Sequence, residues 1–101
     1  MRRWRRRGPK IIELHYYVDP GHGWLKTTIE TLEKYGISEK ISGYSYREGD
    51  NVWLEEDSDA PKLINALRER GIAMKMHVHQ RNTSSPIRRK PPYQMESMKD
   101  A

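Results

Sequence analysis

The order in which the hydrophobic patterns change along this chain most constrains its fold. Alternating apolar and polar residues are typical of strands, whereas apolar residues three or four positions apart are typical of helices. These patterns predict, in chain order, a strand, a helix, two strands, a helix and a strand at Lys10–Val18, Trp24–Tyr35, Ile41–Tyr46, Val52–Glu55, Ala60–Arg70 and Ile72–His79. We therefore expect an α+β, ferredoxin-like domain of β-α-β-β-α-β order, in which two helices cover one face of a four-stranded antiparallel sheet.

Turn residues support these boundaries. Gly36 and Gly71 follow the two predicted helices, where a left-handed cap favours glycine. Arg47–Asn51 has the composition of a hairpin turn between the two middle strands. Asp19–Gly23 is expected to turn the chain from the first strand into the first helix.

Composition limits the chain to one small hydrophobic core. It has 101 residues, of which 35% are hydrophobic, and its mean hydropathy is −1.02. The absence of cysteine excludes disulfides and thiolate metal ligands and permits a cytoplasmic setting. No apolar run reaches the roughly 18 residues of a membrane span. The charged first residues lack the apolar stretch of a signal peptide, so we expect no membrane partner and no export.

Positive charge is concentrated at the two ends of the chain, although the net charge of the whole is +5. Residues 1–9 carry five arginines and no acid, which gives +5. Residues 10–80 carry nine basic and twelve acidic residues (−3), and residues 81–101 carry five basic and two acidic residues (+3). Gly8 and Pro9 follow the basic residues of the first end, and serines and prolines accompany those of the second. The sequence thus predicts a basic N-terminal arm (1–9), one α+β domain (10–80) and a basic, proline-containing C-terminal tail (81–101), with both ends flexible.

Strand alternation predicts a row of aromatic and polar side chains on the sheet face that lacks helices. Aromatic rings on such a face stack on bases in RNA-recognition modules, although nearby carboxylates would repel phosphates. The structural alternative is that Tyr17 and Trp53 form a cross-strand pair, or that a tail or a second subunit covers them. The predicted row contains His15, Tyr17, Trp53, Glu55, Lys75, His77 and His79, with Tyr44 and Tyr46 as further candidates.

Two side-chain clusters invite a metal or a catalytic interpretation, and each has a structural explanation. His15, His77 and His79 would face one side of neighbouring strands, but spacing alone does not orient imidazoles toward a metal. Glu55–Asp59 contains paired carboxylates, yet acids there also suit the end of a strand and the start of a helix. The sequence therefore predicts no catalytic residue, no metal ligand and no cofactor, and we expect a protein that is not an enzyme.

Several short segments of the chain form a recognisable pattern, namely Val18–Leu25, Gly36–Ile37, Lys40–Ser42, Tyr44–Tyr46 and Leu54–Asp57 with Asp59. This pattern resembles small uncharacterised proteins carried by phages, plasmids and prophages. The resemblance covers about residues 15–70 and implies no assigned reaction, cofactor or binding residue. It implies a bacterial cytoplasmic setting, in which short proteins often serve replication, host takeover or evasion of host defence.

The charge layout favours nucleic-acid binding, RNA or DNA, because each basic residue that neutralises a phosphate releases a counterion, and an indole can stack on a base. The alternative is a protein–protein effector that inhibits a host defence complex through the exposed sheet face or the acidic strip Glu55–Asp59. Self-association through the sheet face is also left open. The predicted nucleic-acid contacts are Arg2, Arg3, Trp4, Arg5, Arg6, Arg7, Tyr17, Trp53, Lys75, His77, Arg88, Arg89 and Lys90.

Overall fold

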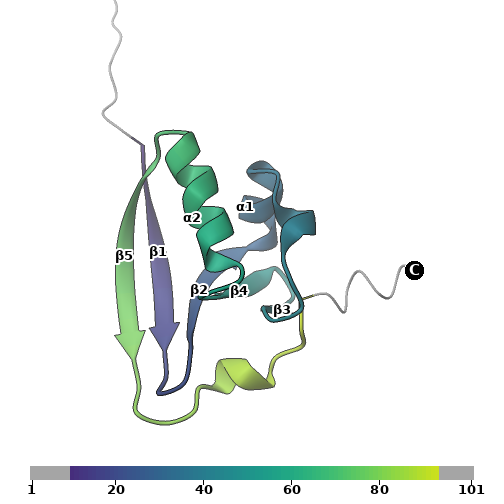
Figure 1. Ribbon diagram of the computed structural model, residues 1–101, viewed down its shortest axis with the longest axis vertical. Helices are drawn as coiled ribbons and strands as arrows, with labels where there is room; N and C mark the ends of the chain where they lie inside the picture. The colour runs from purple at the N-terminus through teal and green to yellow at the C-terminus, as the bar shows by residue number, and fades with distance from the viewer. Residues whose placement is uncertain (1–9, 94–101) are drawn as a thin grey trace, which may run out of the picture.

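A mixed five-stranded sheet with two helices on one face forms the body of the protein (Figure 1). The computed structural model describes residues 10–93, so the predicted contacts from Arg2 to Arg7 lie outside the described residues. Along the sheet the strand order is β3-β4-β2-β1-β5. The chain runs through β1 (Ile11–Val18), β2 (Gly23–Thr28), α1 (Ile29–Lys34), β3 (Tyr46–Glu48), β4 (Asn51–Glu55), α2 (Ala60–Glu69) and β5 (Ala73–Gln80).

The α+β class is confirmed, but the predicted four-stranded antiparallel sheet is wrong. The first half of the predicted helix Trp24–Tyr35 is strand β2, which pairs antiparallel with both β1 and β4. Strand β5 lies parallel to β1, so the sheet is mixed. The error has a local cause, because Thr27 and Thr28 carry branched Cβ atoms that favour a strand. Helix α1 begins only after Thr28, whose side chain caps it by accepting a hydrogen bond from the backbone N–H of Thr31.

The predicted strand Ile41–Tyr46 is also wrong, because a buried carboxylate holds this segment in turns. Asp59 is fully buried and accepts hydrogen bonds from the backbone and hydroxyl of Ser42 and from the hydroxyl of Ser45. Lys62 adds an ion pair at 2.9 Å. Burial would raise the pKa of Asp59, but these hydrogen bonds outweigh it and hold the pKa below its usual value. Only Tyr46 of the predicted strand belongs to β3.

The remaining elements lie close to their predicted places. The first, third and last predicted strands correspond to β1, β4 and β5, and the second predicted helix corresponds to α2. Gly36 and Gly71 have positive φ angles of 74° and 69°, as helix-ending glycines do. The predicted hairpin turn joins β3 to β4.

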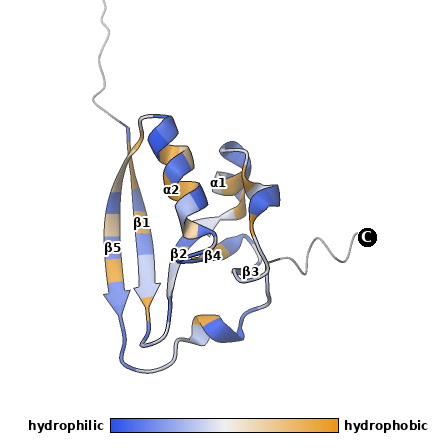
Figure 2. Cartoon of the chain, in the orientation of Figure 1, coloured by the Kyte–Doolittle hydropathy of each residue, from blue (hydrophilic) through white to orange (hydrophobic). Residues whose placement is uncertain are grey.

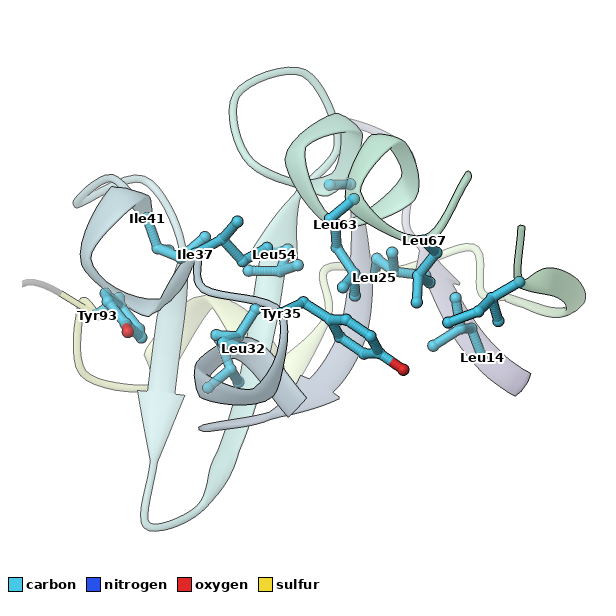
Figure 3. Packing of buried hydrophobic residues seen from close by; sticks show 14 residues of the cluster. Leu14, Leu25, Leu32, Tyr35, Ile37, Ile41, Leu54, Leu63, Leu67 and Tyr93 are labelled. Atoms are coloured by element: carbon cyan, nitrogen blue, oxygen red, sulfur yellow. The ribbon is translucent and has the colours of Figure 1, made fainter. Parts of the chain in front are cut away.

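The main core lies between the helices and the sheet. Leu63 and Leu67 of α2 are fully buried against Leu25 and Leu54, the central residues of β2 and β4 (Figure 3). Hydrophobic and hydrophilic residues alternate along α2, as expected of an amphipathic helix that rests on a sheet (Figure 2). Tyr93, far away in the sequence, belongs to the same core.

Residues 81–93, here called the C-terminal strap, are packed against the sheet rather than flexible as predicted. From β5 the strap passes along the lower edge of the sheet in Figure 1 and returns to β3, where the N–H of Arg47 donates to the carbonyl of Pro91 at 2.8 Å. A short 3₁₀ helix, Pro86–Arg89, places Ile87 with 6% of its surface exposed. The expectation of a flexible ending from residue 81 is therefore corrected for residues 81–93, because this segment supplies apolar side chains to the folded body.

Candidate functional site

The face of the sheet opposite the helices carries the aromatic and histidine row predicted from strand alternation. Residues paired across neighbouring strands point to the same side of a sheet. His15 is paired with Lys26 and His77, and Lys26 is paired with Trp53. Tyr17 follows on the same side, so the structure brings the predicted contacts Tyr17, Trp53, Lys75 and His77 onto one face despite the different topology.

Over β1 and β5 this face presents a stack of rings. The His15 ring stacks on His77 at 4.9 Å and on His79 at 5.1 Å between centroids, and His79 stacks on Tyr17 at 4.7 Å. Nδ1 of His15 lies 2.9 Å from Nε2 of His79, and Nε2 of His77 lies 3.0 Å from a carboxylate oxygen of Glu13. The three predicted histidines therefore lie side by side. They contact one another, Tyr17 and Glu13. We call this half of the face the open half.

Over β2 and β4 the strap covers the same face. Ile87 packs on Trp24 and Trp53, which are 2% and 7% exposed. The guanidinium of Arg88 lies 5.2 Å from the centre of a Trp24 ring, and the ammonium of Lys90 lies 4.7 Å from that of Trp53. The sequence left open whether a tail covers Trp53. In the structure the C-terminal strap does cover it. We call this half the covered half.

A buried ion pair fastens the strap to the turn between β1 and β2. Asp19 accepts hydrogen bonds from Nε and Nη2 of Arg88 at 2.7 and 2.9 Å, and from the backbone N–H of Ser85. Two further bonds come from backbone N–H groups of its own turn, Gly21 and His22. The hydrogen bonds from Arg88 hold the pKa of Asp19 far below its usual range. Arg88, a predicted nucleic-acid contact, is therefore committed to an internal ion pair.

The other predicted basic contacts have different surroundings. Lys90 forms an ion pair with Glu48 at 2.7 Å, in addition to its contact with Trp53. Arg89 and Lys75 are exposed. Of the three basic residues predicted in the strap, Arg89 alone projects into solvent without a salt bridge among the described residues.

Between the strap and the sheet lies a pocket of about 470 Å³, here called the strap pocket. Its lining includes the rings of Tyr17 and Trp53 and three cationic side chains, Lys26, Arg81 and Lys90. Among the described residues that line it there is no carboxylate. Sequence reasoning missed Lys26, because it placed this residue in a helix, and did not single out Arg81.

A second pocket of about 310 Å³, here called the carboxylate pocket, lies where β2 begins and β4 ends. Its lining residues are His22, Trp24, Tyr44, Tyr46, Glu55, Asp57, Ser58 and Arg88. They come from segments that are far apart in the sequence. Sequence reasoning missed this convergence, because it depends on the pairing of β2 with β4.

The acids beside this pocket are not the continuous strip that the sequence suggests. Glu55 is buried, and its Oε1 accepts hydrogen bonds from the backbone N–H groups of Asp57 and Ser58 at 3.0 and 2.8 Å. Asp59 is buried elsewhere, among the serines described above. Glu56 accepts a hydrogen bond from the hydroxyl of Tyr16, and burial together with this carboxylate raises the pKa of Tyr16 to about 12. The strip Glu55–Asp59 therefore does not offer one exposed surface to a partner.

Comparisons of the chain with protein-family models, curated proteins and solved structures returned no match. Within residues 10–93, no helix is long and apolar enough to cross a membrane.

Proposed function

We propose that this protein binds single-stranded nucleic acid and catalyses no reaction. The observation that carries the proposal is the strap pocket, which combines aromatic rings with three cationic side chains and no carboxylate among its described lining residues. Unpaired bases bind to proteins by stacking on aromatic rings, while lysine and arginine neutralise the phosphates. The setting we propose for this activity is the cytoplasm of a bacterial host, which is what a resemblance to phage, plasmid and prophage proteins implies.

The open half of the face supplies the stacking surface. Tyr17 is half-buried, so part of its ring remains accessible at the mouth of the strap pocket. The ring of His79 extends this surface onto β5. Lys75 and the imidazole of His77 continue it along the sheet. A strand of two or three nucleotides would therefore stack on the rings of Tyr17 and His79, and Lys75, which is paired with Glu13, would supply a cationic group farther along β5.

Electrostatics limit where the phosphates run. Glu55, Glu56 and Asp57 line or adjoin the carboxylate pocket, and they repel an anion. We therefore expect the phosphates of a bound strand to lie near Lys26 and Arg81 instead. The basic N-terminal arm adds binding that is independent of base sequence and weakens with salt.

Fluorescence anisotropy with labelled single-stranded RNA and DNA, measured at several salt concentrations, tests the proposal. The double variant Lys26→Gln/Arg81→Gln should reduce the slope of log affinity against log salt by about one to two. Tyr17→Leu should weaken binding by about 1–3 kcal/mol with little change of slope. Arg68→Gln, an exposed change on α2 on the other side of the sheet, is the matched control. Wild-type affinity in the pocket variants, or no binding by the full chain at low salt, would refute the proposal.

A second candidate function, a protein–protein effector acting on a host defence complex, is favoured by the outer edge of β5. This eight-residue strand ends the sheet, and Met76 and Val78 are 39% and 59% exposed on its helix side. An exposed edge strand is a template to which a partner adds a strand. This function predicts a partner complex that Val78→Lys weakens and that Lys26→Gln leaves unchanged. The opposite pattern would favour the nucleic-acid proposal.

A further inference from the structure

We propose that His22, Glu55 and Glu56 form a binding site for a zinc-type divalent cation at the rim of the carboxylate pocket. One donor atom from each residue lies within 4.8 Å of the other two. An imidazole with two carboxylates is a donor set that suits zinc and its neighbours in the transition series, whereas magnesium and calcium prefer oxygen alone. This inference does not depend on the proposed function, because it concerns a different pocket, which Glu55 and Asp57 line together with Arg88.

Glu55 is held so that one of its oxygens remains for a cation. Its Oε1 accepts two backbone hydrogen bonds, from Asp57 and Ser58. Within residues 10–93, no N–H or O–H group donates to its Oε2, which lies 3.6 Å from Nδ1 of His22. The side chain is only 12% exposed, so a buried carboxylate oxygen faces an imidazole without a hydrogen bond. A cation between the two groups would satisfy both.

Glu56 is oriented by a neighbour that is not itself a ligand. The hydroxyl of Tyr16 donates to its Oε2 at 3.2 Å, an arrangement typical of carboxylates that bind metals. This bond requires glycine at position 23, because a Cβ atom there would lie 2.4 Å from the Tyr16 hydroxyl oxygen. Gly23 thus permits the contact that fixes Glu56, which explains why glycine follows His22 directly.

Hydrogen bonds hold the backbone of His22, whereas its ring is half exposed to solvent. Its N–H donates to Asp19, and its carbonyl accepts from the N–H of Asp19 at 2.9 Å. The side chain is 49% exposed, so the imidazole can rotate. Zinc bonds of about 2.0–2.1 Å place tetrahedral ligands about 3.4 Å apart, so donor atoms that now lie within 4.8 Å of one another need to approach by up to about 1.4 Å. Rotation of an exposed ring provides such a movement without unfolding the turn.

Three protein donors leave at least one coordination position for water or for a ligand in the pocket. Trp24 lies 6.0 Å from the His22 ring, and Tyr44 and Tyr46 line the same space. Metal sites that keep an open position beside a shaped cavity are those that bind or activate small molecules. The site is therefore placed to hold a polar or anionic group of a ligand against aromatic walls.

Isothermal titration calorimetry of the full chain, without an affinity tag, with zinc chloride tests the inference. We expect saturable zinc binding that His22→Ala and Glu56→Gln each weaken at least about tenfold. Both variants should keep the wild-type circular dichroism spectrum, since His22 is exposed and glutamine still accepts from Tyr16. Magnesium chloride should give no comparable binding.

His79→Ala is the matched control, because the stacked histidines on the open half offer zinc a competing set of imidazoles. The inference stands if a binding event that depends on His22 and Glu56 remains in this variant. It is overturned if the full chain binds no zinc, if His22→Ala or Glu56→Gln binds like the wild type, or if His79→Ala removes all binding. Glu55 is left intact in these tests because its backbone hydrogen bonds support the end of β4.

Discussion

The two halves of the helix-free face carry similar kinds of side chain but differ in how far these side chains are exposed to solvent. Both present aromatic rings and basic groups in the same pleated rows. In the covered half the rings of Trp24 and Trp53 are almost completely buried beneath the strap, whereas in the open half His15 and His79 remain exposed. The same kind of side chain is thus core in one half and surface in the other. The difference depends on thirteen residues that follow the last strand rather than on the strands themselves.

The largest expected effect comes from removing the cover. A chain that ends at Gln80 exposes the two tryptophans and loses the burial of Ile87 and Tyr93. At about 1.5–3 kcal/mol for each large apolar side chain, the loss is about 5 kcal/mol or more, which is comparable with the whole stability of a small domain. Urea unfolding followed by circular dichroism measures it. If the shortened chain had the same urea midpoint of unfolding as the wild type, the strap would not be part of the folded body.

The second effect concerns the buried ion pair that fastens the strap. Arg88→Gln leaves the Asp19 carboxylate buried without its cation, while the packing of Ile87 remains, so the destabilisation should be large but smaller than that of the deletion. Arg88 holds the folded-state pKa of Asp19 far below the unfolded value of about 3.9. The stability from this pair is therefore fully present above about pH 5 and declines as the pH falls.

Urea midpoints of the wild type and of Arg88→Gln between pH 3 and pH 7 measure this dependence. The difference between the two proteins should be greatest at neutral pH and should shrink toward pH 3. Glu13→Gln on the open half, whose carboxylate is exposed beside His77, is the control and should show no such convergence. A constant difference across the pH range would contradict the role of the Asp19 charge.

The faces of the sheet could be predicted from the sequence because alternation is independent of strand order. His15, Tyr17 and His77 share a side whichever strands are neighbours, so this part of the prediction survived the wrong topology. The helix at Trp24–Tyr35 was wrong because Leu25, Ile29 and Leu32 also fit a spacing of three to four residues. The spacing of these residues fits a single long helix. It fits equally well a strand that is followed by a short helix, which is the arrangement found.

The strap and the carboxylate pocket depend on contacts that no local pattern records. Ile87 and Tyr93 are isolated apolar residues among prolines, serines and arginines, so they give no periodicity. The available signal was indirect, namely the indole of Trp53 on the outward row of a predicted strand, for which a covering tail was one of the alternatives left open. His22 and Glu55 are separated by 33 positions, and only the pairing of β2 with β4 brings them together.

A third prediction compares single side chains in the two halves. Ile87→Ala removes a side chain that is 6% exposed and packed on both tryptophans, which should cost about 2–4 kcal/mol. His77→Ala removes a partly exposed ring from the open half and should change the free energy of unfolding by about 0.5 kcal/mol. Urea denaturation of both variants gives the comparison. Equal costs would mean that the strap shields the face without stabilising it.

The smallest predicted effect separates two lysines on the same face. Lys90 of the strap lies over the Trp53 ring and pairs with Glu48, whose side chain is 61% exposed, so Lys90→Met should cost only about 1 kcal/mol. Lys75 in the open half is exposed, and Lys75→Met should leave stability unchanged within about 0.5 kcal/mol. The ranking should reverse for nucleic-acid binding in low salt, where Lys75 is free to contact a phosphate and Lys90 is partly neutralised by Glu48. Anisotropy titrations that found Lys90→Met the more damaging of the two would mean that Lys90 contacts a phosphate despite its ion pair with Glu48.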